Sequence, residues 1–176
     1  MRISPAKAFT LAAAVGLLAT LSQPATARGE PSVIKRPGDH PDYRFEAEPH
    51  GLVGYAGPFL SGGADLGAGF RGTVIIVDQG FIKSINNSVG IGFGGDLFFR
   101  RGTFAIPVVM QWNFWLTPRW SVFAEPGVML SANPERSRDT FFPAFYGGGR
   151  YHFSDKVSLT IRLGFPSVSV GASFFL

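Results

Sequence analysis

From His50 to the C-terminus, apolar residues alternate with small or polar residues at a period of two. In Val157–Phe165 every second residue is aliphatic or aromatic, and the residues between them include Ser158, Thr160 and Arg162. Successive side chains of a β-strand point to opposite faces. The alternation therefore predicts strands with one apolar face and one small or polar face.

The same pattern divides this part of the chain into eight predicted strands. Turn signals rich in Gly, Pro, Ser, Asn and Asp separate most of them. The predicted strands are Leu52–Phe59, Asp65–Val77, Ser88–Phe99, Phe104–Leu116, Trp120–Leu130, Phe141–Phe153, Val157–Phe165 and Val168–Leu176. We therefore expect one all-β domain over residues 50–176.

The composition of the polar face predicts which face points inward. This face consists mainly of Gly and Ser with a few isolated charges, whereas a water-facing sheet usually carries Lys, Glu, Thr and Gln. We expect the apolar face to meet lipid, which predicts a closed antiparallel up-and-down transmembrane β-barrel of about eight strands. Trp115, Trp120 and Phe153 flank two predicted turns, where an aromatic belt is expected.

The residues before this domain predict an export signal and a linker. Arg2 and Lys7 precede an uncharged apolar run, and Ala25-Thr26-Ala27 is a small-x-small cleavage site, so residues 1–27 are predicted to be a signal peptide. The apolar run is shorter than the roughly 20 residues that a membrane-spanning helix needs. Residues 28–49 contain four prolines and no apolar periodicity, which predicts a flexible leader.

The charge and motif content excludes several classes of function. The net charge of +4 is scattered, and no basic stripe suited to nucleic acid is present. The chain has no Cys and no His-x-x-x-His spacing, so neither a disulfide framework nor a metal site is predicted. Gly67–Gly72 and Gly90–Gly95 match the glycine spacing of the dinucleotide fingerprint. The fingerprint needs a turn between a strand and a helix, whereas both segments lie inside predicted strands, so no cofactor is predicted.

The export signal, the eight alternating segments and the ending Val168–Leu176 resemble the small eight-stranded outer-membrane β-barrel proteins of Gram-negative bacteria. The resemblance covers roughly residues 50–176. It implies a monomer in the cell outer membrane, contact with outer-membrane lipid, insertion by the barrel assembly machinery, and both termini in the periplasm. Members of that family typically end in an aromatic residue, whereas Leu176 here follows Phe174 and Phe175.

Inside the predicted barrel, several charged residues occupy the inward-facing positions of their strands. An eight-stranded barrel has an interior just wide enough for side chains to fill, so these charges are expected to pair across it and plug it. The predicted luminal ion-pair network consists of Arg71, Asp96, Glu125, Arg150 and Arg162, with Tyr146 and His152 on the same face. A narrow ion path through these residues is the alternative.

Two further features have both a functional and a structural interpretation. The predicted surface loop Ser131–Thr140 contains Arg136 and Arg138, which either contact lipopolysaccharide or another surface partner, or are only solvated. His152 and Ser154 could share a strand face as base and nucleophile, but no orienting carboxylate has a recognisable spacing. No catalytic residue is predicted.

These features predict a barrel with a structural or surface-interaction role, a plugged polar lumen and no enzymatic turnover. A narrow channel and an outer-membrane lipid-modifying enzyme are alternatives. A third alternative is a soluble periplasmic, lipocalin-like carrier, which would require an inverted barrel with Leu and Phe inside and Ser and Arg outside.

Overall fold

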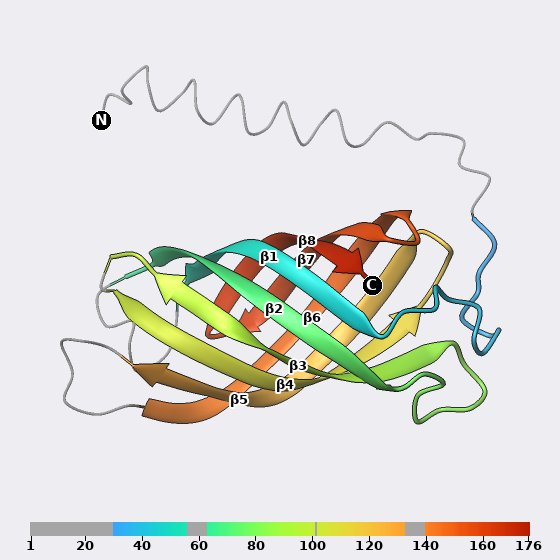
Figure 1. The fold of residues 1–176 in the computed structure, drawn as a ribbon, viewed down its shortest axis with the longest axis horizontal. Coiled ribbons are helices and arrows are strands. Elements are labelled where there is room, and N and C mark those ends of the chain that lie inside the picture. The colour runs from blue at the N-terminus through green and yellow to red at the C-terminus, as the bar shows by residue number, and fades with distance from the viewer. Residues whose placement is uncertain (1–29, 56–62, 101, 133–139) are drawn as a thin grey trace, which may run out of the picture. The chain divides into compact units, whose positions relative to one another are not determined.

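The computed structural model describes residues 30–55, 63–100, 102–132 and 140–176 (Figure 1). The predicted signal peptide and the loop residues Arg136 and Arg138 lie outside these ranges. Among the described residues, no helix is long and apolar enough to cross a membrane. The strands are β1 (Phe45–Gly54), β2 (Asp65–Val77), β3 (Asn87–Phe98), β4 (Thr103–Trp115), β5 (Trp120–Ala132), β6 (Thr140–Ser154), β7 (Val157–Phe165) and β8 (Ser167–Phe175).

The eight strands form one closed antiparallel barrel (Figure 1). Each strand pairs with its neighbours in sequence, and β1 closes the barrel by pairing with β8, with Glu46 opposite Phe175 and Gly54 opposite Ser167. Because β1 also pairs with β8, none of the eight described strands is an edge strand. The predicted closed, up-and-down, eight-stranded barrel is therefore confirmed.

The first strand lies upstream of its predicted position. β1 begins at Phe45, whereas the prediction placed this strand at Leu52–Phe59 and began the barrel at residue 50. Glu46 and Glu48 fall within the predicted leader, yet they alternate along β1 with outward-facing residues and are buried, as is His50. The predicted boundary was wrong because these charges point into the barrel, where they find partners.

The residues before β1 also pack against the barrel. Val33 and Tyr43 are buried, and the Val33 N–H donates to the carbonyl of Leu116 at 2.9 Å. The Asn86 N–H donates to the carbonyl of Ile34 at 2.7 Å. Residues 31–44, here named the N-terminal segment, are thus held by burial and by backbone hydrogen bonds. The prediction of a flexible leader is wrong for these residues.

Large apolar side chains cover the outside of the barrel. Alternation along the strands leaves Leu66, Leu163 and Phe153 exposed by 65%, 60% and 66%, while polar side chains of the same strands are buried. Trp120 also faces outward, but Trp115 is buried inside the barrel. The expected aromatic belt therefore does not include Trp115, which shares the inward phase of β4 with Gln111 and Asn113.

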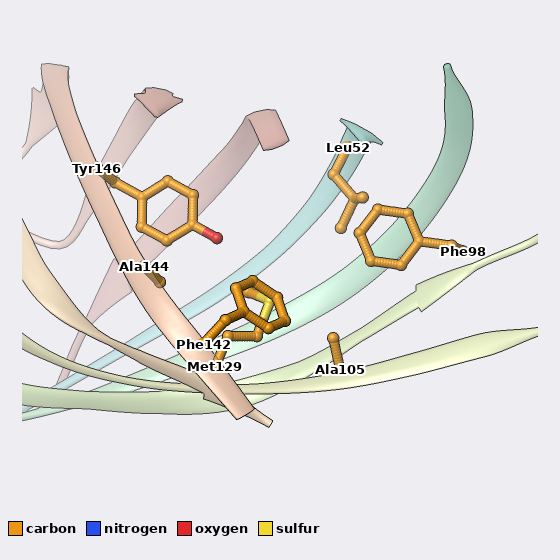
Figure 2. Packing of buried hydrophobic residues seen from close by; sticks show 7 residues of the cluster. All are labelled: Leu52, Phe98, Ala105, Met129, Phe142, Ala144 and Tyr146. Atoms are coloured by element: carbon orange, nitrogen blue, oxygen red, sulfur yellow. The ribbon is translucent and has the colours of Figure 1, made fainter. Parts of the chain in front are cut away.

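The buried apolar residues form two separate clusters. The loop-end cluster lies near the end of the barrel where β1 ends and β2 begins (Figure 2); it consists of Leu52, Phe98, Ala105, Met129, Phe142, Ala144 and Tyr146. The terminal-end cluster lies near the opposite end, where β1 begins and β8 ends; it consists of Val33, Tyr43, Ile75, Trp115 and Phe175. Polar residues occupy the interior between the two clusters.

Candidate functional site

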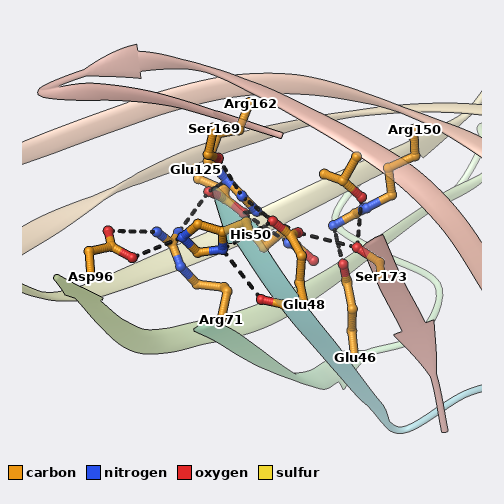
Figure 3. A network of polar contacts seen from close by, with 12 residues as sticks. Glu46, Glu48, His50, Arg71, Asp96, Glu125, Arg150, Arg162, Ser169 and Ser173 are labelled. Carbon is orange, nitrogen blue, oxygen red and sulfur yellow. Dashed lines mark hydrogen bonds and ion pairs between the residues drawn. The ribbon is translucent and has the colours of Figure 1, made fainter. Parts of the chain in front are cut away.

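The candidate site is the group of buried charges drawn in Figure 3. It lies in the polar interior between the two apolar clusters. Six strands contribute to it, because the inward phase of each strand brings its polar residues to the barrel axis. The luminal network consists of Glu46, Glu48 and His50 from β1, Arg71 from β2, Asp96 from β3, Glu125 from β5, Arg150 from β6 and Arg162 from β7.

Glu125 is at the centre of the network. Its Oε2 accepts hydrogen bonds from Arg71 Nη1 at 3.1 Å and from Arg162 Nε at 2.8 Å. Its Oε1 accepts from Gln111 Nε2 at 2.9 Å. One carboxylate therefore connects two arginines from different strands, and charge-assisted bonds of this kind are about twice as strong as neutral ones.

Arg162 joins Glu125 to β1. Its Nη1 and Nη2 donate to the two carboxylate oxygens of Glu48 at 2.6 and 3.0 Å, and its Nη2 also donates to Glu125. A planar guanidinium can bind two carboxylates in this way because its donors point in fixed directions. Arg162 is thus bidentate to Glu48 and ties β7 to β1 and β5.

Arg150 and Glu46 form a second pair closer to the terminal end. Arg150 Nη2 lies 2.7 and 2.9 Å from the two carboxylate oxygens of Glu46, and Arg150 Nη1 donates to Asn113 at 2.7 Å. The Arg150 guanidinium carbon also lies 4.4 Å from the centre of the Phe123 ring, a cation–π contact. This pair links β6 to the start of β1.

His50 and Asp96 extend the network towards the loop end. The Nε2 atom of His50 lies 2.9 Å from Asp96 Oδ1, and Arg71 Nη2 lies 3.9 Å from Asp96 Oδ2. Gly69 provides the space for this contact, because a Cβ at that position would lie only 2.7 Å from His50 Nε2. A side chain at position 69 would therefore push the imidazole away from the carboxylate.

All five charged residues predicted for the lumen lie in the network, whereas Glu46, Glu48 and His50 were missed. A charge count could have found the missing acids. The predicted set held three arginines but only two carboxylates, and a buried cation needs a partner. Glu46 and Glu48 bring the carboxylates to four, and their spacing of two residues matches the strand period.

The other polar residues predicted to face inward are also buried. Tyr146 lies against Arg71, whose guanidinium carbon is 5.5 Å from the ring centre. Trp115 stacks between His40 of the N-terminal segment and His152, with ring centres 5.5 and 4.8 Å away. Burial, together with the nearby Glu46 carboxylate, raises the pKa of Tyr43, so its hydroxyl stays neutral. Tyr43 and Trp115 thus lie at the terminal end of the polar interior, whereas Tyr146 belongs to the loop-end cluster.

His152 contacts a serine other than the predicted one. Its Nε2 lies 2.8 Å from Ser121 Oγ, whereas Ser154 is exposed. A nucleophile and base also need a third group that orients the base. Within the described part of the chain, His152 Nδ1 has no hydrogen-bond partner, and His152 and Ser121 are both buried. The arrangement lacks an orienting carboxylate and access for a substrate.

The described residues also contain no group of three or more His, Cys, Asp and Glu side chains that could hold a metal ion. Glu46, Glu48 and Glu125 instead face arginines at hydrogen-bond distance, and Asp96 faces His50. What the arrangement can do is hold the strands together through buried charge pairs and fill the lumen.

Comparison with solved structures identifies the fold. A de novo designed transmembrane β-barrel superposes with a TM-score of 0.51 at 14% identity, over 81% of this chain and 99% of the design. Neisserial surface protein A gives a TM-score of 0.48 at 11% identity, over 75% and 97%. The Yersinia pestis outer membrane protein Ail gives 0.49 at 8% identity, over 77% and 100%.

No protein-family model matches the chain, and the comparison with curated proteins gives no match. The similarity to the designed barrel concerns the fold, because the sequence identity is low. Together with the closed topology and the apolar outer surface, it bears out the expectation drawn from the strand pattern. The chain has the fold of the eight-stranded transmembrane β-barrels.

Proposed function

We propose that the chain is a cell outer-membrane β-barrel protein with a structural or surface-interaction role and a closed polar lumen. The observation that carries this proposal is the distribution of side chains: apolar outside, charged and paired inside. In water, this arrangement would expose many large apolar side chains, whereas in a bilayer it buries them. The distribution is the opposite of what the soluble-carrier alternative requires.

The first prediction concerns location and closure. Expressed at full length in a Gram-negative host, the protein is expected in the outer-membrane fraction. It should migrate differently on a detergent gel before and after boiling, because closed backbone pairing survives detergent until it is heated. Recovery from the periplasm without detergent would contradict the proposal, as would identical mobility of boiled and unboiled samples.

The second prediction concerns conduction. The luminal network lies between two apolar clusters, and each of its arginines is paired with a buried carboxylate. The wild-type barrel in a planar bilayer should therefore give no steady ion conductance above the background of the bilayer alone. Reproducible single-channel steps that scale with salt concentration would favour the narrow-channel alternative.

We expect no enzymatic turnover, since Ser121 and His152 lie buried beside the terminal-end cluster. Outer-membrane lipid is the expected surrounding, and the barrel assembly machinery is the expected route of insertion. Lipopolysaccharide remains a candidate partner for Arg136 and Arg138. A structural role needs only the stable barrel, whereas a surface role would depend on the connections at the loop end.

A further inference from the structure

The connection between β2 and β3, residues 78–86, carries two adjacent apolar side chains that face away from the protein. This β2–β3 connection lies at the terminal end of the barrel, the end that the N-terminal segment covers (Figure 1). Phe81 and Ile82 are exposed by 57% and 40%, and Lys83 beside them is exposed as well. Connections usually run through water and carry polar residues. The exposed pair therefore points to an apolar surrounding.

The side chain of Asn87 fixes the shape of the β2–β3 connection. Its Nδ2 donates to the carbonyl oxygens of Ile82 and Ile85 at 2.7 and 2.8 Å. Its Oδ1 accepts a hydrogen bond from Trp112 Nε1 at 2.9 Å. Since Trp112 belongs to β4, Asn87 ties the connection to the wall of the barrel. The backbone at Ile82 is therefore held in a defined position.

The β2–β3 connection continues the lipid-facing wall of the barrel. The ring of Phe81 meets the ring of Trp112 edge to face, with 5.6 Å between the ring centres, and Trp112 contacts the ring of Phe114 at 4.9 Å. Trp112 and Phe114 lie on the outer side of β4, because Asn113 between them points into the lumen and binds Arg150. The apolar outer surface thus extends from β4 onto the connection.

The N-terminal segment holds the two ends of the β2–β3 connection. His40 Nε2 lies 3.2 Å from the carbonyl oxygen of Asp78, the first residue of the connection. Asn86, its last residue, donates from Nδ2 to the carbonyl oxygen of Asp39 at 2.7 Å. These contacts are made by polar residues, and the apolar pair in the middle of the connection stays exposed.

We propose that the β2–β3 connection is a membrane anchor: Phe81 and Ile82 enter the leaflet at the terminal end, and the Lys83 ammonium binds phosphate groups of its phospholipids. The proposal rests on the proposed function, because it requires a bilayer around the barrel. Lys83 Nζ donates to the Gln79 carbonyl oxygen at 3.1 Å, and an ammonium group has three donors. Aromatic rings and lysines gather at membrane interfaces, where the ammonium extends to the headgroups.

Continuity with the barrel wall favours lipid over a protein partner as the occupant of this surface. Ile76, near the end of β2, is exposed by 57%, and Trp112 beside Phe81 faces outward. A protein bound at Phe81 would have to displace lipid from this neighbouring wall. A phospholipid leaflet covers the wall and the connection together, and its phosphate groups complement the charge of Lys83.

Because the chain contains no cysteine, single cysteine variants allow a direct test of depth in the membrane. Each full-length variant is labelled with a nitroxide and inserted into nanodiscs of equal phosphatidylglycerol and phosphatidylcholine. Relaxation of the label by oxygen and by a water-soluble nickel complex then reports its depth. The labelled positions are Ile82, the outward-facing Leu163 as the lipid reference, and the exposed Lys156 of the β6–β7 turn as the water reference.

We expect the label at Ile82 to resemble the label at Leu163. Nickel should relax it about tenfold less than the label at Lys156, because ions are excluded from hydrocarbon. Ile82→Cys keeps Phe81 and the backbone carbonyl that Asn87 binds, so the connection retains its shape.

An Ile82 label as accessible to nickel as the Lys156 label would overturn the proposal, although the membrane location would stand. An Ile82 label that is in water in nanodiscs but immobilised in native outer membranes would also overturn it, in favour of a protein partner. A nickel-accessible label at Leu163 would instead contradict the proposed function.

The role of Lys83 is tested by the stability of the barrel in vesicles with and without phosphatidylglycerol. The gain in the folding equilibrium constant with this anionic lipid should be about fivefold smaller for Lys83→Gln than for wild type, as expected for one lysine at an anionic surface. Lys156→Gln is the matched control and should show the wild-type gain. An equal gain in Lys83→Gln and wild type would overturn the assignment of phosphate to Lys83.

Discussion

Replacing Glu125 with alanine is expected to lower the free energy of unfolding of the barrel by about 3–5 kcal/mol, the usual cost of removing one partner from a buried ion pair. Glu125 accepts hydrogen bonds from Arg71, Arg162 and Gln111, and all of these groups are buried. Without it, the described residues leave Arg71 the 3.9 Å contact with the Asp96 carboxylate and the contact with the Tyr146 ring, so a poorly compensated charge remains in the interior.

The measurement is urea unfolding of the protein in lipid vesicles, followed by tryptophan fluorescence. Asp155→Ala is the control, because Asp155 is an exposed acid in the turn between β6 and β7. The control should unfold within about 0.5 kcal/mol of wild type, as surface substitutions usually do. If Glu125→Ala unfolded at the same urea concentration as the control, the carboxylate would not hold the network together.

Replacing Glu46 with alanine should have a similar effect, a loss of about 3–5 kcal/mol. Both carboxylate oxygens of Glu46 lie within 3 Å of Arg150 Nη2, and the two side chains are almost completely buried. This prediction separates the two interpretations of the region, because a glutamate in a flexible leader would contribute almost nothing to the stability of the barrel.

The control for Glu46 is Asp42→Ala, since Asp42 is an exposed acid in the N-terminal segment close to β1. A double variant, Glu46→Leu with Arg150→Met, should lose less stability than the two single variants added together, because it leaves neither charge unpaired. Equal stability of Glu46→Ala and Asp42→Ala would show that the barrel does not depend on this pair.

Most of the strand pattern was readable from the sequence because the barrel has two chemically different surfaces. Along β7, aliphatic residues alternate with Ser158, Thr160 and Arg162, so the inward face was evident without any tertiary information. The same alternation placed Arg71, Asp96 and Glu125 on inward positions, and in the structure Arg71 lies within 4 Å of both acids. The first strand was the exception, since the middle of β1 carries Ala47, Pro49 and Gly51 on its outer face and charges on its inner face.

Trp115 and His152 show contacts that the alternation of side chains along a strand could not predict. An aromatic residue beside a turn suits a membrane interface, but Trp115 faces inward on β4, where it stacks on His40 and contacts the ring of His152. His152 could have shared a face with Ser154, yet a register shift near the end of β6 and the pairing with β5 bring it to Ser121. Such contacts depend on the neighbouring strand, which local sequence does not specify.

The sequence by itself determined the fold class, the number of strands and the polar character of the interior, because side-chain alternation is a local property of each strand. Only the tertiary structure decided which charges pair, that β1 starts at Phe45, and that the N-terminal segment helps to close one end. The physical reason is that the residues next to Glu46 in the sequence give no sign of a partner, so its carboxylate is expected to face solvent. It becomes a buried partner only when barrel closure brings β1 and β6 to opposite sides of one lumen.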